Sequence, residues 1–388
     1  MKWEKVKLGE LYEVHNGLSK AGKFFGEGYP FLTFSTVFNN YFIPKQITDL
    51  VQSTEKEQES YSIRRGDVFV TRTSETSDEL GMSCVALKDY PMATYNGFTK
   101  RMRPITNRVF PEYIGYYMRL PSFRGEFRAF STMTTRASLR NEDLLGLEVK
   151  LPSIEIQKQI AGILSAYDDL IENNQKQIKL LEEAAQRLYK EWFVNLRFPG
   201  HENTKIVDGV PEGWRISSIY DVFDIKYGKN LPTSKITKVG QYPVYGASGV
   251  IGYYNEKNCD DYVTLVTSRG NGSGDVFRTH HKQSYVTNNS FIARRNDKNI
   301  FIKNEFTFQL FSNTDFKKLC TGSAQPQLTN TSIQKIKIFL PNRQLIEKYQ
   351  RCTIEMSEKQ EVLYKEQRAL TQARNRLLSK LINGTVEV

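Results

Sequence analysis

Cysteines and long apolar runs are both scarce in this chain of 388 residues. The four cysteines, Cys84, Cys259, Cys320 and Cys352, lie far apart and form no C-x-x-C pair. Their spacing argues against a zinc ribbon and against a disulfide framework. No apolar run approaches the ~18 residues of a transmembrane span, and the N-terminal stretch lacks the apolar core of a secretory signal. We therefore expect a cytoplasmic protein that does not associate with a membrane.

What is present is enough for folded cores and a basic surface. Hydrophobic residues make up 39% of the chain and aromatic residues 12%, with a mean hydropathy of -0.50. The length suits two or three domains. A net charge of +11 and a pI near 9.2 favour a polyanionic partner.

The sequence repeats itself half a protein apart. The stretch TTRASLRNEDLLGLEVKLP, which ends at Pro152, aligns without a gap with GSAQPQLTNTSIQKIKIFLP, which ends at Pro341. Earlier segments give further pairs: Leu8 with Ile219, Gly17 with Gly228, Arg72 with Arg269, Asn96 with Asn289, Phe98 with Phe291, and Arg101 with Arg294. The loops between them diverge, so the sequence predicts one scaffold used twice with different loops.

Each half is rich in β-branched and aromatic residues up to its Leu-Pro, after which the apolar period changes to that of a helix. The seam after Pro152 alternates spacings of four and three, with Asn174 as a polar member of the kind that fixes register. After Pro341 one line is apolar, and the other is poorer, with Thr353, Gln360, Gln367, Arg374 and Leu381. The predicted seam residues are Ile160, Leu164, Tyr167, Ile171, Asn174, Ile178, Leu181, Ala185, Leu188, Trp192, Tyr349, Met356, Leu363, Leu370 and Leu377.

Two such seams in one chain favour an intramolecular antiparallel pair of helices, each roughly 60 Å long. The predicted fold is α+β: two β-rich globular domains, each followed by a long helix, with the helices forming an antiparallel coiled coil of pseudo-twofold symmetry. The predicted boundaries are domain one at 1–152, the first helix at 153–197, a linker at 198–212, domain two at 213–341, and the second helix with the C-terminal tail at 342–388.

This order of parts resembles the specificity (S) subunit of a type I restriction-modification enzyme. The resemblance covers essentially the whole chain and is most specific in LEVKLPSIEIQKQIAGILSAYDDLIENNQKQIKLLEEAAQRLYKEWF, IKIFLPNRQLIEKYQ and RLLSKLINGTVEV. It implies that each globular domain is a target-recognition domain for one half of a split double-stranded DNA site. It also implies that the helices set the distance between the halves and dock two methyltransferase subunits, joined by restriction/translocase subunits. S-adenosylmethionine, ATP and Mg²⁺ are then expected in those partners, and no cofactor in this chain.

A pseudo-twofold reader should meet half-sites about one helical turn apart, roughly 34 Å, on one face of the duplex. Lysine and arginine would supply affinity for phosphates, and side chains that reach base edges would supply specificity. The candidate DNA contacts of domain one are Arg72, Thr73, Ser74, Lys100, Arg101, Arg103, Thr135, Arg136 and Arg140. Those of domain two are Lys226, Tyr227, Lys229, Ser268, Arg269, Asn271, Arg294, Arg295, Gln325, Gln327 and Asn330.

Recognisable catalytic motifs are absent. The sequence has neither the motif of base methylation nor a phosphate-binding loop, and the run RGNGSG lacks the lysine of such a loop. His280 and His281 have no third ligand at metal spacing and are interpreted as surface residues. We predict no catalytic residue and no metal site. Two alternatives stay open: a self-contained sequence-specific nuclease, and a coiled-coil adaptor that binds only proteins.

Overall fold

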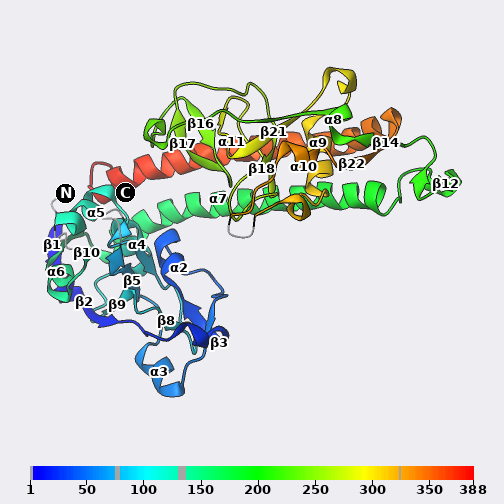
Figure 1. The fold of residues 1–388 in the computed structure, drawn as a ribbon. Coiled ribbons are helices and arrows are strands. Elements are labelled where there is room, and N and C mark those ends of the chain that lie inside the picture. Colours follow the sequence, from blue (N-terminus) through cyan, green and yellow to red (C-terminus); the bar gives the residue numbers. More distant parts are fainter. Residues whose placement is uncertain (1–2, 75–78, 130–136, 323–324) are drawn as a thin grey trace. The chain divides into compact units, whose positions relative to one another are not determined.

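The computed structural model describes residues 3–74, 79–129, 137–322 and 325–388. The chain forms two compact units, one of residues 1–171 with 369–388, and one of residues 172–368. Their division falls inside the two long helices, so each unit holds a β-rich part and a segment of both helices. We call the β-rich parts head one (residues 3–151) and head two (residues 214–340). The predicted α+β fold class is confirmed (Figure 1).

Head one contains a four-stranded sheet, a three-stranded sheet and two strand pairs. The four-stranded sheet has the order β2 (Tyr12–Asn16), β9 (Thr99–Pro104), β5 (Val68–Thr71), β7 (Ser83–Val85). The three-stranded sheet has the order β4 (Leu50–Val51), β3 (Phe25–Leu32), β8 (Thr94–Tyr95), with β8 parallel to β3. The first and last strands of the head, β1 (Glu4–Lys7) and β11 (Glu148–Leu151), pair antiparallel.

Head two has the same strand order. Its four-stranded sheet consists of β15 (Phe223–Tyr227), β21 (Ser290–Arg295), β18 (Thr264–Thr267) and β19 (Val276–Arg278). Its three-stranded sheet consists of β17 (Val250–Tyr254), β16 (Tyr242–Tyr245) and β20 (Tyr285–Val286), and β20 is again the parallel strand. The closing pair is β14 (Arg215–Ser218) with β22 (Lys337–Leu340).

Short helices recur at the same places in the two heads. The equivalent pairs are α1 (Leu8–Leu11) with α8 (Ile219–Val222), α4 (Pro111–Tyr117) with α9 (Asn304–Ser312), and α6 (Asn141–Gly146) with α10 (Asn330–Ile333). The remaining elements are α2 (Phe34–Asn39), α3 (Glu55–Ser60), α5 (Pro121–Ala129), the strand pairs β6 (Thr73–Ser74) with β10 (Ala137–Ser138) and β12 (Ile206–Val207) with β13 (Val210–Pro211), and 3-10 turns at Gly22–Phe24, His201–Asn203, Thr233–Lys235, Asp297–Asn299 and Lys317–Leu319.

The hydrogen bonds correct one pairing made between the halves. The N–H of Arg72 donates to the carbonyl of Phe98 at 3.0 Å, and the N–H of Ser268 donates to the carbonyl of Asn289 at 2.9 Å. Arg72 therefore corresponds to Ser268 and not to Arg269. A one-residue slip in an extended chain turns the side chain to the opposite face, so the two arginines do not share a role.

The strand after this turn was also aligned in the wrong register. Met102 of β9 pairs with the first residue of β5, and Ala293 of β21 pairs with the first residue of β18. The next residues, Arg103 and Arg294, are therefore equivalent, whereas the sequence alignment had paired Arg101 with Arg294. The same two-residue shift applies to the pairs Asn96 with Asn289 and Phe98 with Phe291. Two residues are one full period of a strand, so the wrong register reproduced the same alternation.

The glycine pair Gly17 and Gly228 is correctly aligned, and the structure explains it. Each residue follows the first strand of its four-stranded sheet and passes directly over the chain that leaves β8 or β20. A Cβ at Gly17 would collide with the carbonyl oxygen of Asn96, and one at Gly228 with that of Thr287. No larger residue fits this crossing, which both heads share.

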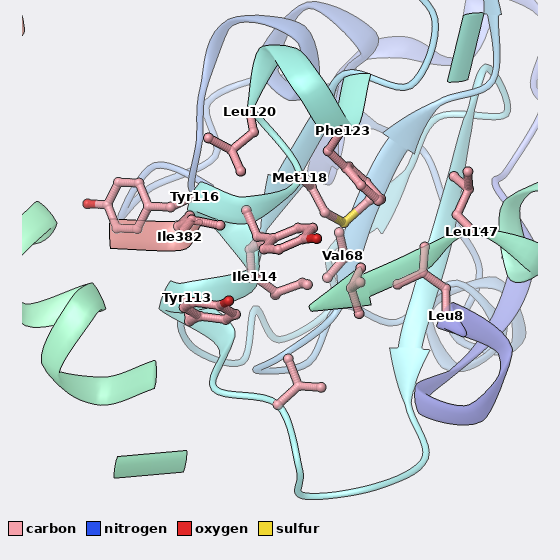
Figure 2. Close-up of a cluster of buried hydrophobic side chains, with 14 of the residues drawn as sticks. Leu8, Val68, Tyr113, Ile114, Tyr116, Met118, Leu120, Phe123, Leu147 and Ile382 are labelled. Atoms are coloured by element: carbon pink, nitrogen blue, oxygen red, sulfur yellow. The ribbon is translucent and has the colours of Figure 1, made fainter. Parts of the chain in front are cut away.

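The core of head one lies between its four-stranded sheet and α4 and continues onto the long helices of unit one. Figure 2 shows Tyr113, Ile114 and Tyr116 of α4 in this cluster, with Val68 from β5 and Ile382 from the last helix. All five side chains are 0% exposed. Because one apolar cluster joins head and helices, the head is packed onto the helices as a single folded unit.

The long helices are α7 (Ile154–Tyr189), which continues as a π-helical turn at Lys190–Val194, and α11 (Arg343–Ile382). Figure 1 shows them in green and in orange to red. In unit two the Tyr349 hydroxyl donates to the carbonyl of Ala185 at 3.1 Å, and Nε2 of Gln360 donates to that of Ile178 at 3.3 Å. The contacts descend α7 as they ascend α11, so the helices run antiparallel there.

The side chains between the helices include many polar ones. All the predicted seam residues are buried or half-buried, and so is the poorer line of α11. Thr353 and Gln360 on that line are 0% and 4% exposed, which makes them as buried as the apolar residues beside them. Asn174 is 4% exposed, and its Nδ2 atom has no hydrogen-bond partner. A buried amide of this kind favours one register over others at a cost in stability.

In each head a buried glutamine from a long helix binds the loop that leads into α4 or into its equivalent, α9. Gln157 of α7 accepts from the N–H of Phe110 at 2.8 Å and donates to the carbonyls of Arg108 and Pro152, both at 2.9 Å. The loop it binds leads into α4. We call this arrangement a glutamine clamp.

The clamp of head two is made by Gln350 of α11. Its side chain accepts from the N–H of Lys303 at 2.6 Å and donates to the carbonyl of Phe301 at 2.9 Å, in the loop that leads into α9. Gln157 and Gln350 are not aligned in the sequence repeat, since the position aligned with Gln157 is Ile346. Equivalent loops of the two heads are therefore bound by glutamines whose positions in the repeat differ by about one helical turn.

Candidate nucleic-acid interface

Three chain segments of head one meet just after β5, an inner strand of the four-stranded sheet. The N–H of Arg72, just after β5, donates to the carbonyl of Phe98 in the turn before β9. The N–H of Leu139, just after β10, donates to the carbonyl of Arg72 at 3.0 Å. Arg72 and Leu139, which border two of the predicted DNA-binding loops, are therefore neighbours joined by a main-chain hydrogen bond. We call this meeting point the loop junction of head one.

Head two has the same loop junction. The N–H of Leu328 donates to the carbonyl of Ser268 at 2.9 Å, which repeats the bond between Leu139 and Arg72. Arg269 and Gln327 form an antiparallel bridge where head one has β6 and β10. The main chain at this junction is thus shared, while the residues that occupy it differ between the heads.

Among the residues that the structure describes, the junction of head one presents the ring of Phe98 and two arginines, Arg72 and Arg140, that have hydrogen-bond partners. Phe98 is 59% exposed, although it is a large apolar side chain. Arg72 is half-buried, with Nη1 3.5 Å from the carbonyl oxygen of Gly97. Arg140 is exposed, and its Nε donates to the Asp143 carboxylate at 2.8 Å. Phe98 was missed from sequence because an aromatic beside a strand is usually a core residue.

Two of the other candidates of head one lie in a strand near this junction, and two lie outside the described residues. Thr73 and Ser74 lie in β6, which pairs with β10. Thr135 and Arg136 lie outside the described residues.

Head two presents polar and basic side chains at its junction. Arg269, Asn271 and Gln325 are exposed, and Gln327 is half-buried. Asn330, also exposed, accepts a hydrogen bond from the Tyr220 hydroxyl at 3.2 Å. These side chains offer donors and acceptors of the kind that read base edges.

Three further candidates lie on or after β15. Lys226 and Lys229 are exposed, while Tyr227 packs its ring 4.1 Å from that of Phe291. Ser268 is fully buried, and its hydroxyl donates to the carbonyl of Asn288 at 3.2 Å. The two lysines are therefore available to a phosphate, whereas Tyr227 and Ser268 hold the sheet and the junction in place.

The three cations expected on β9 point into head one, which corrects their interpretation as DNA contacts. Lys100 is 5% exposed and donates to the side-chain oxygen of Asn141, and burial, with the nearby charge of Arg72, lowers its pKa. Arg101 is 3% exposed, and Nη1 donates to the carbonyl of Ser62 at 2.8 Å. Burial lowers the pKa of Arg101 as well. The charge of Lys100 and Arg101 predicts exposed side chains, but hydrogen bonds to internal partners hold both side chains inside the head.

The third cation, Arg103, forms a bidentate salt bridge with the carboxylate of Asp67, which is 0% exposed. The hydrogen bond to Asp67 raises the pKa of Arg103. In head two the equivalent Arg294 is exposed, as is Arg295. A pair of exposed arginines at the end of a strand suits phosphate binding, so head two keeps at this position a surface that head one lacks.

The histidines His280 and His281 are half-buried, which corrects their assignment to the surface. The ring of His280 stacks 4.0 Å from that of Tyr364 on α11, beside a cavity of about 220 Å³. His281 shares a hydrogen bond of 2.8 Å between Nδ1 and the Tyr245 hydroxyl. Burial, with the neighbouring arginines, lowers their pKa values to about 3 and about 4. Both rings are therefore neutral packing groups at neutral pH.

Within the described ranges, no three His, Cys, Asp or Glu side chains come together in a group that could hold a metal ion. Cys84 and Cys259 are buried, Cys320 is half-buried and Cys352 is exposed, and all four are free thiols in this structure. Among the helices described, none combines the length and apolar character needed to cross a membrane.

The chain has clear relatives among known proteins. The family model described as "Type I restriction modification DNA specificity domain" matches residues 1–183 and 211–368, so each match holds one head and part of the following helix. The chain belongs to this type I restriction-modification specificity family.

Individual relatives agree with this assignment. The chain is 25% identical to the type I restriction enzyme MjaIX specificity subunit of Methanocaldococcus jannaschii, over 100% of the chain and 94% of the relative. It is 24% identical to a putative type I specificity subunit of Mycoplasma genitalium, over 83% of the chain and 84% of the relative. The crystal structure of an S subunit from M. genitalium matches its fold with a TM-score of 0.55 at 18% identity, over 98% of the chain and 96% of that structure.

Proposed function

We propose that this specificity subunit reads a bipartite, asymmetric DNA target, with one half-site for each head. The observation that carries the proposal is the repeated loop junction. Both heads bring the same main-chain segments together at the end of the same strand, but Arg72 and Phe98 of head one are replaced by Ser268 and Asn289 in head two. Shared main chain with different side chains suits two readers that bind duplex DNA alike and prefer different bases.

The charge distribution supports DNA as the ligand. The chain carries a net charge of +11, and Lys226, Lys229, Arg269, Arg294 and Arg295 are exposed on head two. Such cations bind phosphates without regard to sequence and make affinity depend on salt. In head one Arg103, the equivalent of Arg294, is neutralised by Asp67, so we expect binding at that half-site to depend more on Phe98 and on the loops around it.

The proposed partners are two methyltransferase subunits and the restriction/translocase subunits that complete a type I enzyme, which would act in the cytoplasm. In that assembly this chain is not the catalyst. S-adenosylmethionine, ATP and Mg²⁺ would bind to the partners. The family membership and the two long helices, which offer an extended surface for assembly, support this arrangement.

The test is a head exchange read by methylome sequencing. Cells that carry the chain with its methyltransferase should show methylation at one bipartite motif. Replacing residues 213–341 by the second head of another family member should change one half-site and leave the other as it was. A change in both half-sites, or in neither, would contradict the proposal.

Two controls address the alternatives left open above. DNA cleavage by the pure chain with Mg²⁺ would favour a self-contained nuclease. A chain that gives no footprint on DNA, even with methyltransferase present, would favour a protein-binding adaptor. The proposed function predicts no cleavage and two protected patches about one helical turn apart.

A further inference from the structure

Head two is joined to both long helices through one buried arginine. Arg278 of β19 places Nη1 2.6 Å from the Glu305 carboxylate of α9, within the head. Its Nη2 lies 3.2 Å from the carboxylate of Glu182 on α7 and 2.6 Å from the side-chain oxygen of Gln360 on α11. The Arg278 side chain is only 10% exposed. One guanidinium therefore ties the head to α7 and α11 together.

The partners of Arg278 are themselves held. Gln360 donates to the main chain of α7 at Ile178, and the Tyr364 hydroxyl donates to Glu182 at 3.4 Å. The Ser357 hydroxyl donates to Glu305 at 3.0 Å. Every group around the arginine thus has a second partner, which leaves the cluster one arrangement that satisfies all its members.

Head one has a corresponding cluster of different composition. Asp168 of α7 accepts from the hydroxyl of Tyr116 on α4 at 2.6 Å and forms an ion pair with Arg374 of α11. The guanidinium of Arg374 lies 5.2 Å from the centre of the Tyr41 ring. Here the arginine belongs to the helix and the aromatic rings to the head, yet the cluster again contains all three elements.

The two clusters use the same heptad positions. Asp168 and Glu182 are two heptads apart on α7, and Gln360 and Arg374 are two heptads apart on α11. Each helix runs unbroken through both positions. A device that recurs at one heptad position, with unrelated residues, serves the same purpose in both heads.

That purpose follows from the energetics of sliding. An apolar seam offers similar contacts after a shift of one heptad, so apolar packing alone selects a register weakly. A buried charge that loses its partners is strongly unfavourable, and a shift in register would separate every pair in the cluster. The clusters therefore penalise any other position of a head along the helices.

We infer that Arg278 and Arg374 are positioning residues that fix the register of each head on the helices and so restrict the number of base pairs between the two half-sites. This inference rests on the proposed bipartite target. It assigns spacer selectivity to two side chains that need not touch DNA.

The test measures spacer selectivity with the full chain and its methyltransferase. The substrates are duplexes that carry the native target, found by methylome sequencing, or the same target with one base pair added to or removed from its spacer. The variants are Arg278→Met and Arg374→Met, which keep side-chain length without charge. The readout is the ratio of methylation rates on native and altered spacers.

We expect each variant to lower this ratio about tenfold, the effect of losing one charged hydrogen-bonding group, with the preferred bases unchanged. Arg374→Lys, which retains a cation for Asp168, should keep most of the selectivity. Arg376→Met, at an exposed position of α11, should behave as wild type. Should Arg278→Met fail to fold, Gln360→Leu removes one partner and keeps the arginine.

The outcomes separate this inference from the proposed function. Equal losses on all spacers, with an unchanged ratio, would show that the arginines only stabilise the fold and would overturn the inference. A wild-type chain that directs methylation to no bipartite target would contradict the proposed function, and the inference with it.

Discussion

The guanidinium of Arg103 and the carboxylate of Asp67 form two parallel hydrogen bonds, Nε to Oδ1 at 2.8 Å and Nη2 to Oδ2 at 2.6 Å. Asp67 is fully buried, so the pair belongs to the interior of head one. Arg294 takes the same strand position in head two and is exposed. One residue type at one place in the repeat therefore stabilises one head and is available for binding in the other.

Replacing these two arginines should separate the two roles. Arg103→Ala leaves Asp67 buried without its partner, and we expect a loss of about 3–5 kcal/mol in the free energy of unfolding of head one. Arg294→Ala should leave that free energy unchanged within about 0.5 kcal/mol. It should weaken DNA binding for all sequences alike and reduce the salt dependence by about one phosphate contact. Urea unfolding and salt-dependent binding assays measure both effects. A stable Arg103→Ala variant would contradict the structural role.

Phe98 is expected to contact DNA through apolar surface at the loop junction. Phe98→Ala removes a side chain that is 59% exposed, so stability should change little, while affinity for the half-site of head one should fall by up to about tenfold. Replacing thymine by uracil in that half-site removes a methyl group, and the variant should respond to it less than wild type. Ile105→Ala is the matched control, because Ile105 is 57% exposed and lies beyond the other end of β9. Equal effects of the two variants on binding would exclude this role.

The glutamine clamps predict a matched pair of stability losses. Gln157→Leu and Gln350→Leu keep side-chain bulk but leave buried main-chain groups without partners. We expect each to lower the free energy of unfolding by about 2–4 kcal/mol, as summed from the lost hydrogen bonds. Gln175→Leu, at an exposed position of α7, is the control and should be neutral. Denaturant unfolding followed by circular dichroism measures the three, and neutral clamp variants would contradict the assignment.

His280 predicts a specific dependence of stability on pH. Its burial and the charge of Arg278 lower its pKa to about 3, against an ordinary value of about 6.5. Between these values the unfolded chain binds a proton that the folded chain does not, so stability falls as pH drops below about 6.5. The loss from this group between pH 7 and pH 5 is up to about 2 kcal/mol.

The matched variant is His280→Phe, which retains a ring against Tyr364 and cannot be protonated. Unfolding curves at pH 7 and pH 5 should show a smaller difference for His280→Phe than for wild type. His15→Phe, at an exposed histidine, should keep the wild-type difference. Identical pH dependence in wild type and His280→Phe would show that His280 does not carry the effect.

The fold class could be predicted from the sequence because its determinants are local and repeated. The change of apolar period after Pro152 and Pro341 marks the start of each long helix, and the repeat shows that both halves share one plan. Register within the sheets could not be predicted as well. A slip of two residues preserves the pattern of a strand, so only the hydrogen bonds reveal that Arg103 and not Arg101 corresponds to Arg294.

Exposure of a candidate side chain could be predicted from the sequence for residues such as Arg269, but not for a polar residue that has an internal partner. Lys100 looked like a surface residue because lysine is rarely buried, yet Asn141, distant in sequence, provides its acceptor. In the sequence, Gln360 weakens the apolar pattern of the seam, because that pattern carries no information about hydrogen bonds. It is instead where α11 bonds to α7 and to Arg278. Whether these polar side chains are buried depends on contacts with residues that are distant in the sequence, and composition and periodicity do not predict such contacts.

Both glutamine clamps bind their loops through main-chain atoms: Gln157 through the N–H of Phe110 and the carbonyl of Arg108, Gln350 through the N–H of Lys303 and the carbonyl of Phe301. These bonds do not depend on which side chains the loop carries. A head with another loop sequence and the same backbone path would therefore form the same clamp on the same helix. At these two joins, loop sequence can therefore vary between relatives without loss of the bonds that hold the loop to the helix.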